Sequence, residues 1–328
     1  MRALTYDRYG GPEAHVLRDD EPVPAAAPGE VLVRVEAVGL NPYDWHIFRG
    51  DPWLARLAFG LRGPGHRIVG SDVAGTIETI GDGVRGWSPG DRVAAFVGFG
   101  GCAALVAVPV DRLARIPEGV AATTAAATPI GALTALAGLE PHDLPRRSRV
   151  LVIGASGGVG HMAVQIARVL GAQRVVAVCS GRNAAMVPEL GADRVIDYTR
   201  ESVLDCGERF DVILDTVATT PLRRLRHLID PGGVYAPAGG LGGGPLLGPA
   251  WPMYRAKVAG VTVRHVAVAN VAAKDEDNGG DVARVLGWIA DGSVRAVVEA
   301  ALPLEDHVAA FERLESQHVA GKLVLTLP

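Results

Sequence analysis

A glycine-rich turn between a short apolar strand and a helix constrains this chain more than any other feature. Residues 150–153 are apolar and mostly β-branched, and glycines follow at positions 154, 157, 158 and 160. Apolar residues then recur at helical spacing up to Gly171, a typical helix stop. Glycines let the backbone approach a pyrophosphate, and the first N–H groups of the helix hold it. The stretch from 149 to 171 therefore predicts an anion site.

The residues that follow supply the context that a glycine pattern alone lacks. A second β-rich run covers 174–179 at the spacing of a βαβ unit, and apolar runs at 194–196 and 212–214 continue the alternation. This pattern predicts a doubly wound parallel sheet of the Rossmann type. The structural alternative is a glycine turn that packs a helix on a strand without binding a ligand.

The end of the second strand predicts which dinucleotide binds. An acid at this position usually bonds the ribose 2′-hydroxyl of NAD. Here the strand ends at Cys179, followed by Ser180 and Arg182, which can bind a 2′-phosphate. The sequence therefore favours NADPH. The alternative for Arg182 is a solvated loop tip, and Cys179 is interpreted as structural.

Composition excludes several classes of protein. The 328 residues suffice for two domains, with 48% hydrophobic and 21% charged residues and a net charge of −4. No basic run indicates nucleic-acid binding, and no apolar stretch reaches the roughly 18 residues of a membrane span. The three cysteines form neither a disulfide framework nor a zinc cluster. We expect a reducing, cytoplasmic compartment and no membrane association.

Short strands separated by turns dominate residues 1–125 and predict a distorted barrel. An alanine-rich helix with a break at Pro129 follows over 121–139. Residues 258–269 form an apolar run of high β propensity. An exposed strand of this kind needs a cover, so we expect a homodimer that pairs through it. Further helices are expected at 281–290 and 305–315, and a closing strand at 323–327.

With these residues in view, the chain resembles the medium-chain dehydrogenase/reductase superfamily, and within it the zinc-independent quinone oxidoreductase, or zeta-crystallin-like, branch. The resemblance extends over the whole chain. Its anchors are the segments 29–35, 41–45, 70–75, 90–93, 132–135, 154–160, 190–198, 211–215 and 321–325.

The resemblance implies an α/β protein with a GroES-like, β-rich substrate domain and a Rossmann NADPH-binding domain. The first covers 1–125 and is completed by 270–328, and the second covers 126–269. A dimer or tetramer is implied as well. The implied cofactor contacts run from the nicotinamide to the phosphates: Thr134, Gly157, Gly158, Val159, Gly160, Ser180, Arg182, Tyr198, Val217, Gly239 and Lys322.

Two departures from the zinc-dependent members argue against a metal site. Asn41 stands where their first cysteine ligand is, and Ser71 replaces the histidine of their Gly-His-Glu segment. The four-cysteine lobe is absent too. Without soft or imidazole ligands a catalytic zinc site cannot form, so no metal is expected. His66 is interpreted as a surface histidine.

The absence of a polarising metal favours acceptors that stabilise a transferred hydride themselves, namely quinones and α,β-unsaturated carbonyls. The resemblance implies that Asn41, Tyr43 and His46 supply hydrogen bonds or a proton to the acceptor. The structural alternatives are that Asn41 caps or turns the backbone, that Tyr43 packs and that Asp44 holds the loop.

Two other functions stay open. One is a dedicated enoyl reductase for a biosynthetic, polyketide-type intermediate, which the pocket under residues 43–62 and 241–255 would distinguish. The other belongs to a different class, a non-catalytic NADPH-binding protein with a regulatory or structural role. Binding of NADPH without turnover of any acceptor would support it, since one fold hosts many functions.

Overall fold

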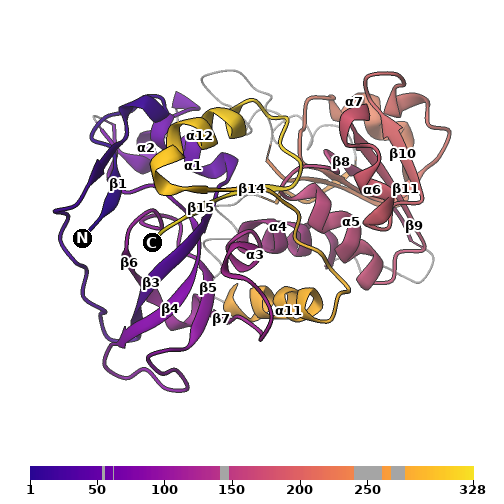
Figure 1. Cartoon of the computed structure of the whole chain (residues 1–328). Helices are drawn as coiled ribbons and strands as arrows, with labels where there is room; N and C mark the ends of the chain where they lie inside the picture. Colours follow the sequence, from indigo (N-terminus) through magenta and orange to yellow (C-terminus); the bar gives the residue numbers. More distant parts are fainter. Residues whose placement is uncertain (54–55, 62, 141–147, 240–260, 267–277) are drawn as a thin grey trace. The chain divides into compact units, whose positions relative to one another are not determined.

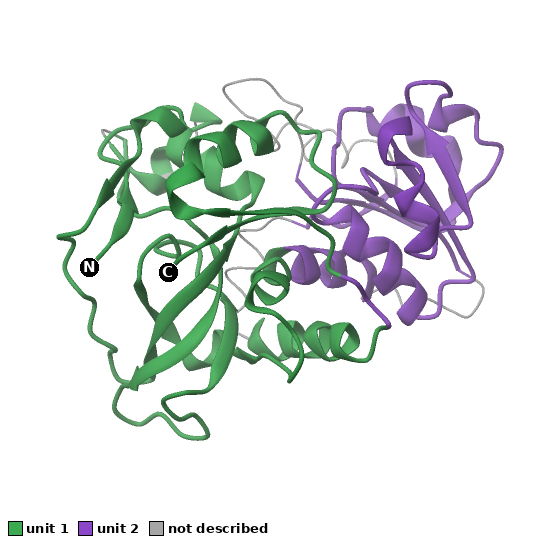
Figure 2. Ribbon diagram, in the orientation of Figure 1, with its two compact units in different colours: residues 1–130, 274–292, 296–328 green, residues 131–273, 293–295 purple. Residues whose placement is uncertain are grey.

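The computed structural model describes residues 1–53, 56–61, 63–140, 148–239, 261–266 and 278–328. The chain divides into two compact units (Figure 2). Unit 1 consists of Met1–Ile130, Lys274–Gly292 and Ala296–Pro328, and unit 2 of Gly131–Ala273 and Ser293–Arg295. The domain boundaries predicted after residues 125 and 269 lie a few residues before these.

Unit 1 is built on a seven-stranded sheet in the order β14-β15-β3-β4-β5-β7, with β6 paired to β3. All pairs are antiparallel except β14 with β15. The strands are β3 (Glu30–Gly39), β4 (Asp72–Ile80), β5 (Arg92–Phe96), β6 (Leu105–Pro109), β7 (Ala114–Arg115), β14 (Val298–Pro303) and β15 (Lys322–Thr326). Both chain ends thus build one sheet, as the resemblance implies.

Short elements complete unit 1. Strands β1 (Ala3–Thr5) and β2 (Val16–Arg18) form a separate antiparallel pair. The helices are α1 (Pro42–Arg49), α2 (Arg56–Phe59), α3 (Ala122–Ala126), α11 (Asn278–Ala290) and α12 (His307–Glu315), with 3₁₀ turns η1 (Pro12–Ala14), η3 (Val110–Arg112) and η8 (Leu304–Asp306). Helix α1 is one of the elements that the sequence analysis did not assign. Pro42 begins it, a position where a missing N–H costs nothing.

Unit 2 holds a six-stranded, fully parallel sheet in the order β10-β9-β8-β11-β12-β13 (Figure 1). This confirms the doubly wound prediction, with the order reversing between β8 and β11. The strands are β8 (Arg149–Ile153), β9 (Arg174–Cys179), β10 (Arg194–Asp197), β11 (Phe210–Asp215), β12 (Ile229–Pro237) and β13 (Thr262–Val263).

Helices connect the parallel strands of unit 2. The hydrophobic residues of these strands are buried, because helices cover both faces of a parallel sheet. The helices are α4 (Pro129–Leu139, which starts in unit 1), α5 (Gly160–Val169), α6 (Met186–Glu189) and α7 (Leu222–Leu225), with 3₁₀ turns η5 (Gly181–Asn183), η6 (Val203–Asp205) and η7 (Arg226–Leu228). The break predicted at Pro129 is the start of α4.

Only part of the apolar run at 258–269 is described. Residues 262–263 form β13, which pairs in parallel with β12 and is the last strand of the sheet in the described chain. The rest of that run outside 261–266, and the segment 241–255 on which the enoyl reductase pocket depends, lie outside the described residues. No helix among the described residues is long and apolar enough to cross a membrane.

Candidate cofactor and active site

The glycine turn after β8 is a close backbone cradle at the start of α5. Gly154 has φ of +82°, and its carbonyl accepts the N–H of Gly157 at 3.0 Å. A Cβ at position 160 would lie 2.1 Å from that same carbonyl oxygen, so only glycine fits there. A Cβ at position 157 would meet nothing closer than 3.4 Å. Gly160 is thus needed by the fold, whereas Gly157 leaves room beside the helix start, where anions bind.

The other predicted cofactor residues of unit 2 follow the carboxyl ends of its strands. Because parallel strands end at one edge of a sheet, these residues share the edge of the glycine turn. Ser180 and Arg182 follow β9, Tyr198 follows β10, Val217 follows β11 and Gly239 follows β12. The fold therefore brings five residues far apart in sequence to one edge.

The loop after β9 is tied to the glycine turn by a residue that the sequence analysis missed. Asn183 donates from Nδ2 to Ser156 Oγ at 3.0 Å. Arg182, beside it, is exposed, and its guanidinium has no partner among the described residues. An unpaired arginine near an anion-binding turn suits a phosphate ligand. No pattern in the sequence singles out Asn183.

One acid lies near this loop on the neighbouring strand. A Cβ at position 181 would come within 2.4 Å of Asp197 Oδ2. Asp197 itself accepts the N–H and hydroxyl of Thr199 at 3.0 and 2.7 Å, and these hydrogen bonds lower its pKa. Arg200 is exposed without an ion pair in the described chain. The charge of Arg200 also lowers the pKa of Asp197 and so partly offsets this carboxylate, which the sequence analysis did not consider.

The loop after β11 is held by a buried carboxylate, Asp215. Its Oδ1 accepts the N–H groups of Val217 at 3.0 Å and Ala218 at 2.7 Å, and its Oδ2 accepts the Tyr235 hydroxyl at 2.9 Å. Burial raises the pKa of Asp215. A Cβ at position 154 would lie 2.8 Å from Val217 Cγ2, so Val217 borders the glycine turn.

The remaining unit 2 residue is Thr134 on α4. Thr134 is only 3% exposed, and its Oγ1 has no hydrogen-bond partner among the described residues. A buried hydroxyl without a partner is rare, because it loses its hydrogen bonds to water. This hydroxyl, the glycine cradle and the unpaired Arg182 fit a dinucleotide with a polar amide and an extra phosphate.

Unit 1 contains a buried polar cluster at the start of α1. Asn41 is 2% exposed, and its Nδ2 lies 3.0 Å from both Ser71 Oγ and Asp72 Oδ2, and 3.1 Å from the Gly39 carbonyl. The Lys322 ammonium donates to Asn41 Oδ1 and lies 3.2 Å from Asp72 Oδ2. We call these side chains, Asn41, Ser71, Asp72 and Lys322, the buried cluster.

This geometry bears on two of the predictions. The Asn41 amide nitrogen already has three acceptors inside unit 1, which suits the capping alternative, and its contact with a substrate stays a prediction. Lys322 is 2% exposed and donates to Asn41 and Asp72, so its ammonium is already paired inside unit 1, and its role at the cofactor phosphate stays a prediction. A buried ammonium needs a carboxylate nearby, and Asp72 supplies it.

Asp44 closes the first turn of α1. Its Oδ2 accepts the backbone N–H of Asn41 at 2.8 Å, whereas its Oδ1 is buried without a partner. Burial raises the pKa of Asp44 to about 7, against the opposing effects of hydrogen bonds from Ser71 and Asn41. Asp44 therefore holds the loop through the Asn41 N–H, which is the structural role considered for it above. With a pKa of about 7, its carboxyl is partly protonated at neutral pH.

Tyr43 and His46 lie on α1, half-buried. The Tyr43 ring contacts Phe96 and Phe99 edge-on or tilted, and its hydroxyl makes no hydrogen bond within the described chain. Burial raises the pKa of Tyr43, so the hydroxyl keeps its proton. His46 stacks on Trp45 and donates from Nδ1 to the Asp51 carbonyl at 2.7 Å. Burial lowers its pKa, which favours neutral imidazole over an acid.

The donor set of unit 1 does not fit a catalytic zinc ion. The buried cluster offers an amide, a hydroxyl and one carboxylate, and an ammonium already lies among them, whereas zinc prefers thiolate and imidazole ligands. No group of three His, Cys, Asp or Glu in the described part of the chain is arranged to hold a metal. His66 is exposed and stacks on Phe99, with centroids 3.9 Å apart.

Comparison with known proteins agrees with this arrangement. The family model of the alcohol dehydrogenase GroES-like domain matches residues 27–118, and that of zinc-binding dehydrogenases matches 190–325. A chloroplast envelope quinone oxidoreductase homolog of Arabidopsis thaliana is 32% identical over 99% of this chain and 98% of its own. An NADPH-dependent alkenal/one oxidoreductase from the same plant is 30% identical over 99% and 79%.

Among solved structures, the quinone oxidoreductase of Coxiella burnetii superposes with a TM-score of 0.86 at 26% identity, over 100% of this chain and 99% of its own. The likeness extends to both units, and the anchors of the sequence resemblance lie within the matched lengths. The chain therefore belongs to the medium-chain dehydrogenase/reductase superfamily, in its quinone oxidoreductase branch.

Proposed function

We propose that this protein is an NADPH-dependent reductase of quinones or α,β-unsaturated carbonyls that works without a metal. One observation carries the proposal most: the Lys322 ammonium, paired with Asp72, lies in the buried cluster that would have to supply metal ligands. Without a Lewis acid, simple ketones are poor acceptors, whereas a quinone or enone delocalises the charge that it receives.

The carboxyl edge of the unit 2 sheet would hold the cofactor, whose reduced nicotinamide supplies the hydride. The glycine cradle suits the pyrophosphate, and the unpaired guanidinium of Arg182 suits the 2′-phosphate. The Thr134 hydroxyl, buried without a partner, suits the nicotinamide end. Tyr198, 57% exposed after β10, offers a face to the adenine, and Val217 and Gly239 would border the nicotinamide ribose.

Tyr43 is the α1 residue best suited to the acceptor. It is protonated, half-buried and without a hydrogen-bond partner among the described residues. Such a hydroxyl can stabilise a developing oxyanion by one hydrogen bond. His46, neutral and bonded to the Asp51 carbonyl, would orient α1 rather than donate a proton.

The names of the relatives support this class of acceptor, since they include quinone and alkenal/one oxidoreductases. The enoyl reductase alternative uses the same hydride transfer from NADPH to an unsaturated carbonyl and differs only in a larger, biosynthetic acceptor. The non-catalytic alternative predicts NADPH binding without oxidation by any acceptor.

The first test measures NADPH oxidation by the EDTA-treated protein with a panel of quinones, enones and simple ketones. The readout is the loss of absorbance of the reduced nicotinamide. Turnover of quinones or enones without added metal is expected, and Tyr43→Phe should reduce kcat by about 10²-fold with NADPH affinity unchanged. Turnover of ketones alone, or a need for zinc, would overturn the proposal. NADPH binding without any turnover would favour the non-catalytic alternative.

A second test isolates the choice of cofactor. Arg182→Gln should weaken NADPH binding about tenfold and leave NADH binding unchanged, because only NADPH carries the 2′-phosphate. Arg85→Gln is the matched control, since Arg85 is also exposed and unpaired in the described chain but belongs to unit 1. An equal loss for both cofactors would contradict this role of Arg182.

Assembly and location extend the same proposal. β13 is the outermost strand of the sheet in the described chain, and the apolar run at 258–269 to which it belongs would be covered in a homodimer. Sedimentation should then give a dimer, and a charged substitution at Val263 should dissociate it. The described cysteines are free thiols, which agrees with a reducing cytoplasmic compartment.

A further inference from the structure

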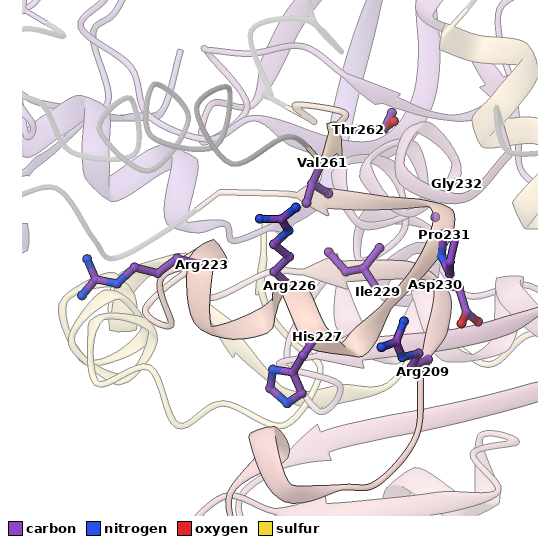
Figure 3. Close-up of a pocket in the computed structure, with 11 residues that line it drawn as sticks. Arg209, Arg223, Arg226, His227, Ile229, Asp230, Pro231, Gly232, Val261 and Thr262 are labelled. Atoms are coloured by element: carbon purple, nitrogen blue, oxygen red, sulfur yellow. The ribbon is translucent and has the colours of Figure 1, made fainter.

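A cavity of about 540 Å³ lies in unit 2, at the amino ends of β11, β12 and β13 (Figure 3). Arg209 precedes β11, residues 229–233 begin β12, and Val261 and Thr262 come from the edge of the sheet. The amino ends of parallel strands lie at the sheet edge opposite their carboxyl ends. This cavity is therefore separate from the glycine turn and from the predicted cofactor residues that follow the carboxyl ends of these strands.

Positive side chains surround this cavity without matching acids. Arg209, Arg223 and Arg226 are exposed, and none makes a hydrogen bond or ion pair with a described residue. Among the described lining residues Asp230 is the only acid, and it pairs with Arg149 at 2.8 Å. Three guanidinium charges are thus left without a counter-ion among the described residues.

These arginines contrast with most others in the described chain. Arg174, for example, binds Glu208, and Arg168 pairs with Asp193. An arginine keeps its charge at every physiological pH, and its planar fork binds phosphate oxygens in pairs. Unpaired arginines gathered around one hollow therefore form an electrostatic site for an anion.

The placement of the arginines favours an anion with more than one charged group. In Figure 3, Arg226 and Arg209 project on opposite sides of Ile229, and Arg223 extends from α7 away from both. An anion with two linked phosphate groups could contact the arginines on both sides. Ile229 and Val261 supply an apolar floor, and the volume lies within the range of small-molecule sites.

We propose that this cavity binds a small anion with at least two linked phosphate groups. The anion would bridge Arg226 and Arg209 across Ile229. The site lies outside the reductase machinery, so it would act as an effector or storage site rather than as part of turnover. The proposal does not depend on which acceptor the enzyme reduces.

The test is calorimetric titration of the NADPH-saturated protein with inorganic pyrophosphate at constant ionic strength. Saturation with NADPH keeps pyrophosphate away from the glycine turn. The wild-type protein should bind pyrophosphate, and Arg226→Gln and Arg209→Gln should each weaken binding by about five- to tenfold. Arg85→Gln, the exposed control in unit 1, should bind as the wild type does.

Three results would overturn the proposal. The first is no binding to the wild-type protein, and the second is unchanged binding by both cavity variants. The third is a loss of pyrophosphate binding in Arg182→Gln with none in Arg226→Gln, which would place the anion at the cofactor site. Both cavity variants replace exposed side chains that have no partner among the described residues, so their folding and NADPH oxidation should stay at the wild-type level. The reductase assay therefore reports on the proposed function independently.

Discussion

The Lys322 ammonium lies 3.2 Å from Asp72 Oδ2, although the two side chains are only 2% and 0% exposed. Asn41 contacts both, accepting from Lys322 through Oδ1 and donating to Asp72 through Nδ2. The C-terminal strand of the chain, β15, is thereby tied to β4 and to the start of α1. Removing one charge from such a buried pair leaves the other without compensation.

Lys322→Met should therefore destabilise the protein by about 3–5 kcal/mol, measured by urea unfolding. The apolar replacement keeps most of the volume but leaves the Asp72 carboxylate buried alone. The double variant with Asp72→Asn should recover part of this loss, because it removes the orphan charge.

The same variant separates two roles for Lys322. A purely structural role predicts that folded Lys322→Met retains its preference for NADPH over NADH. A selective loss of NADPH affinity, with stability unchanged, would restore the role at the phosphate that the family resemblance implies.

Asp44 should make stability depend on pH. Burial raises the pKa of its carboxyl to about 7 in the folded protein from an ordinary value near 3.8. A raised acid pKa favours the folded state at low pH, and this contribution is lost as pH rises from about 4 through 7. The stability of Asp44→Asn relative to wild type should thus increase by about 2–3 kcal/mol between pH 5 and pH 8.

Denaturation curves at several pH values measure this difference. Asp82→Asn is the control, since Asp82 is exposed on a turn and should show no such trend. A difference between Asp44→Asn and wild type that stays constant with pH would show that Asp44 is already ionised in the folded protein.

The parallel sheet was predictable because its signals are local. The apolar run before Gly154, the glycine spacing and the helical stripe all lie within one βαβ unit. The predicted cofactor residues that follow the strands could be placed together as well, since the carboxyl ends of parallel strands meet at one edge of the sheet. Helix α1 was not predicted because it spans only eight residues, too few to show a clear helical repeat of apolar residues.

The buried cluster was not predictable in the same way. Its members come from three distant strands and loops, and no pattern in the sequence shows that Lys322 reaches Asn41. The residue types stand out in the sequence, where Asn41 is predicted to contact the substrate and Lys322 the cofactor. Their mutual hydrogen bond depends on the antiparallel pairing of β15 with β3, which no local pattern shows.

His15 should make the protein sensitive to acid. Its ring is buried against Phe48 and Phe311, and neither ring nitrogen has a hydrogen-bond partner in the described part of the chain. Burial, and then the nearby charges of His307 and Arg49, lower its pKa to about 3. A lowered histidine pKa means that the unfolded chain binds the proton better, so stability falls as pH drops below the ordinary value near 6.5.

The variant His15→Phe removes the imidazole that takes up this proton in the unfolded chain. Its stability relative to wild type should rise by about 2–3 kcal/mol between pH 7.5 and pH 4.5, as followed by thermal or urea unfolding. His318→Phe, at an exposed position, should show no comparable slope. Parallel curves for His15→Phe and wild type would mean that the ring is accessible to solvent in the folded state.

Two glycines of one turn should respond differently to the same methyl group. In Gly160→Ala the new Cβ would lie 2.1 Å from the Gly154 carbonyl oxygen, which is backbone and cannot move aside. We expect a loss of stability of about 1–3 kcal/mol or more together with loss of NADPH binding. In Gly157→Ala the nearest atom is 3.4 Å away, so the fold should be kept.

If the turn cradles the pyrophosphate, the methyl group of Gly157→Ala should still weaken NADPH binding about tenfold, because it occupies space that the phosphates need. Unfolding curves and fluorescence titration with NADPH on both variants measure the two effects separately. Wild-type affinity in Gly157→Ala would show that the phosphates do not approach the backbone at this position. The glycine turn would then not be the site that holds the pyrophosphate.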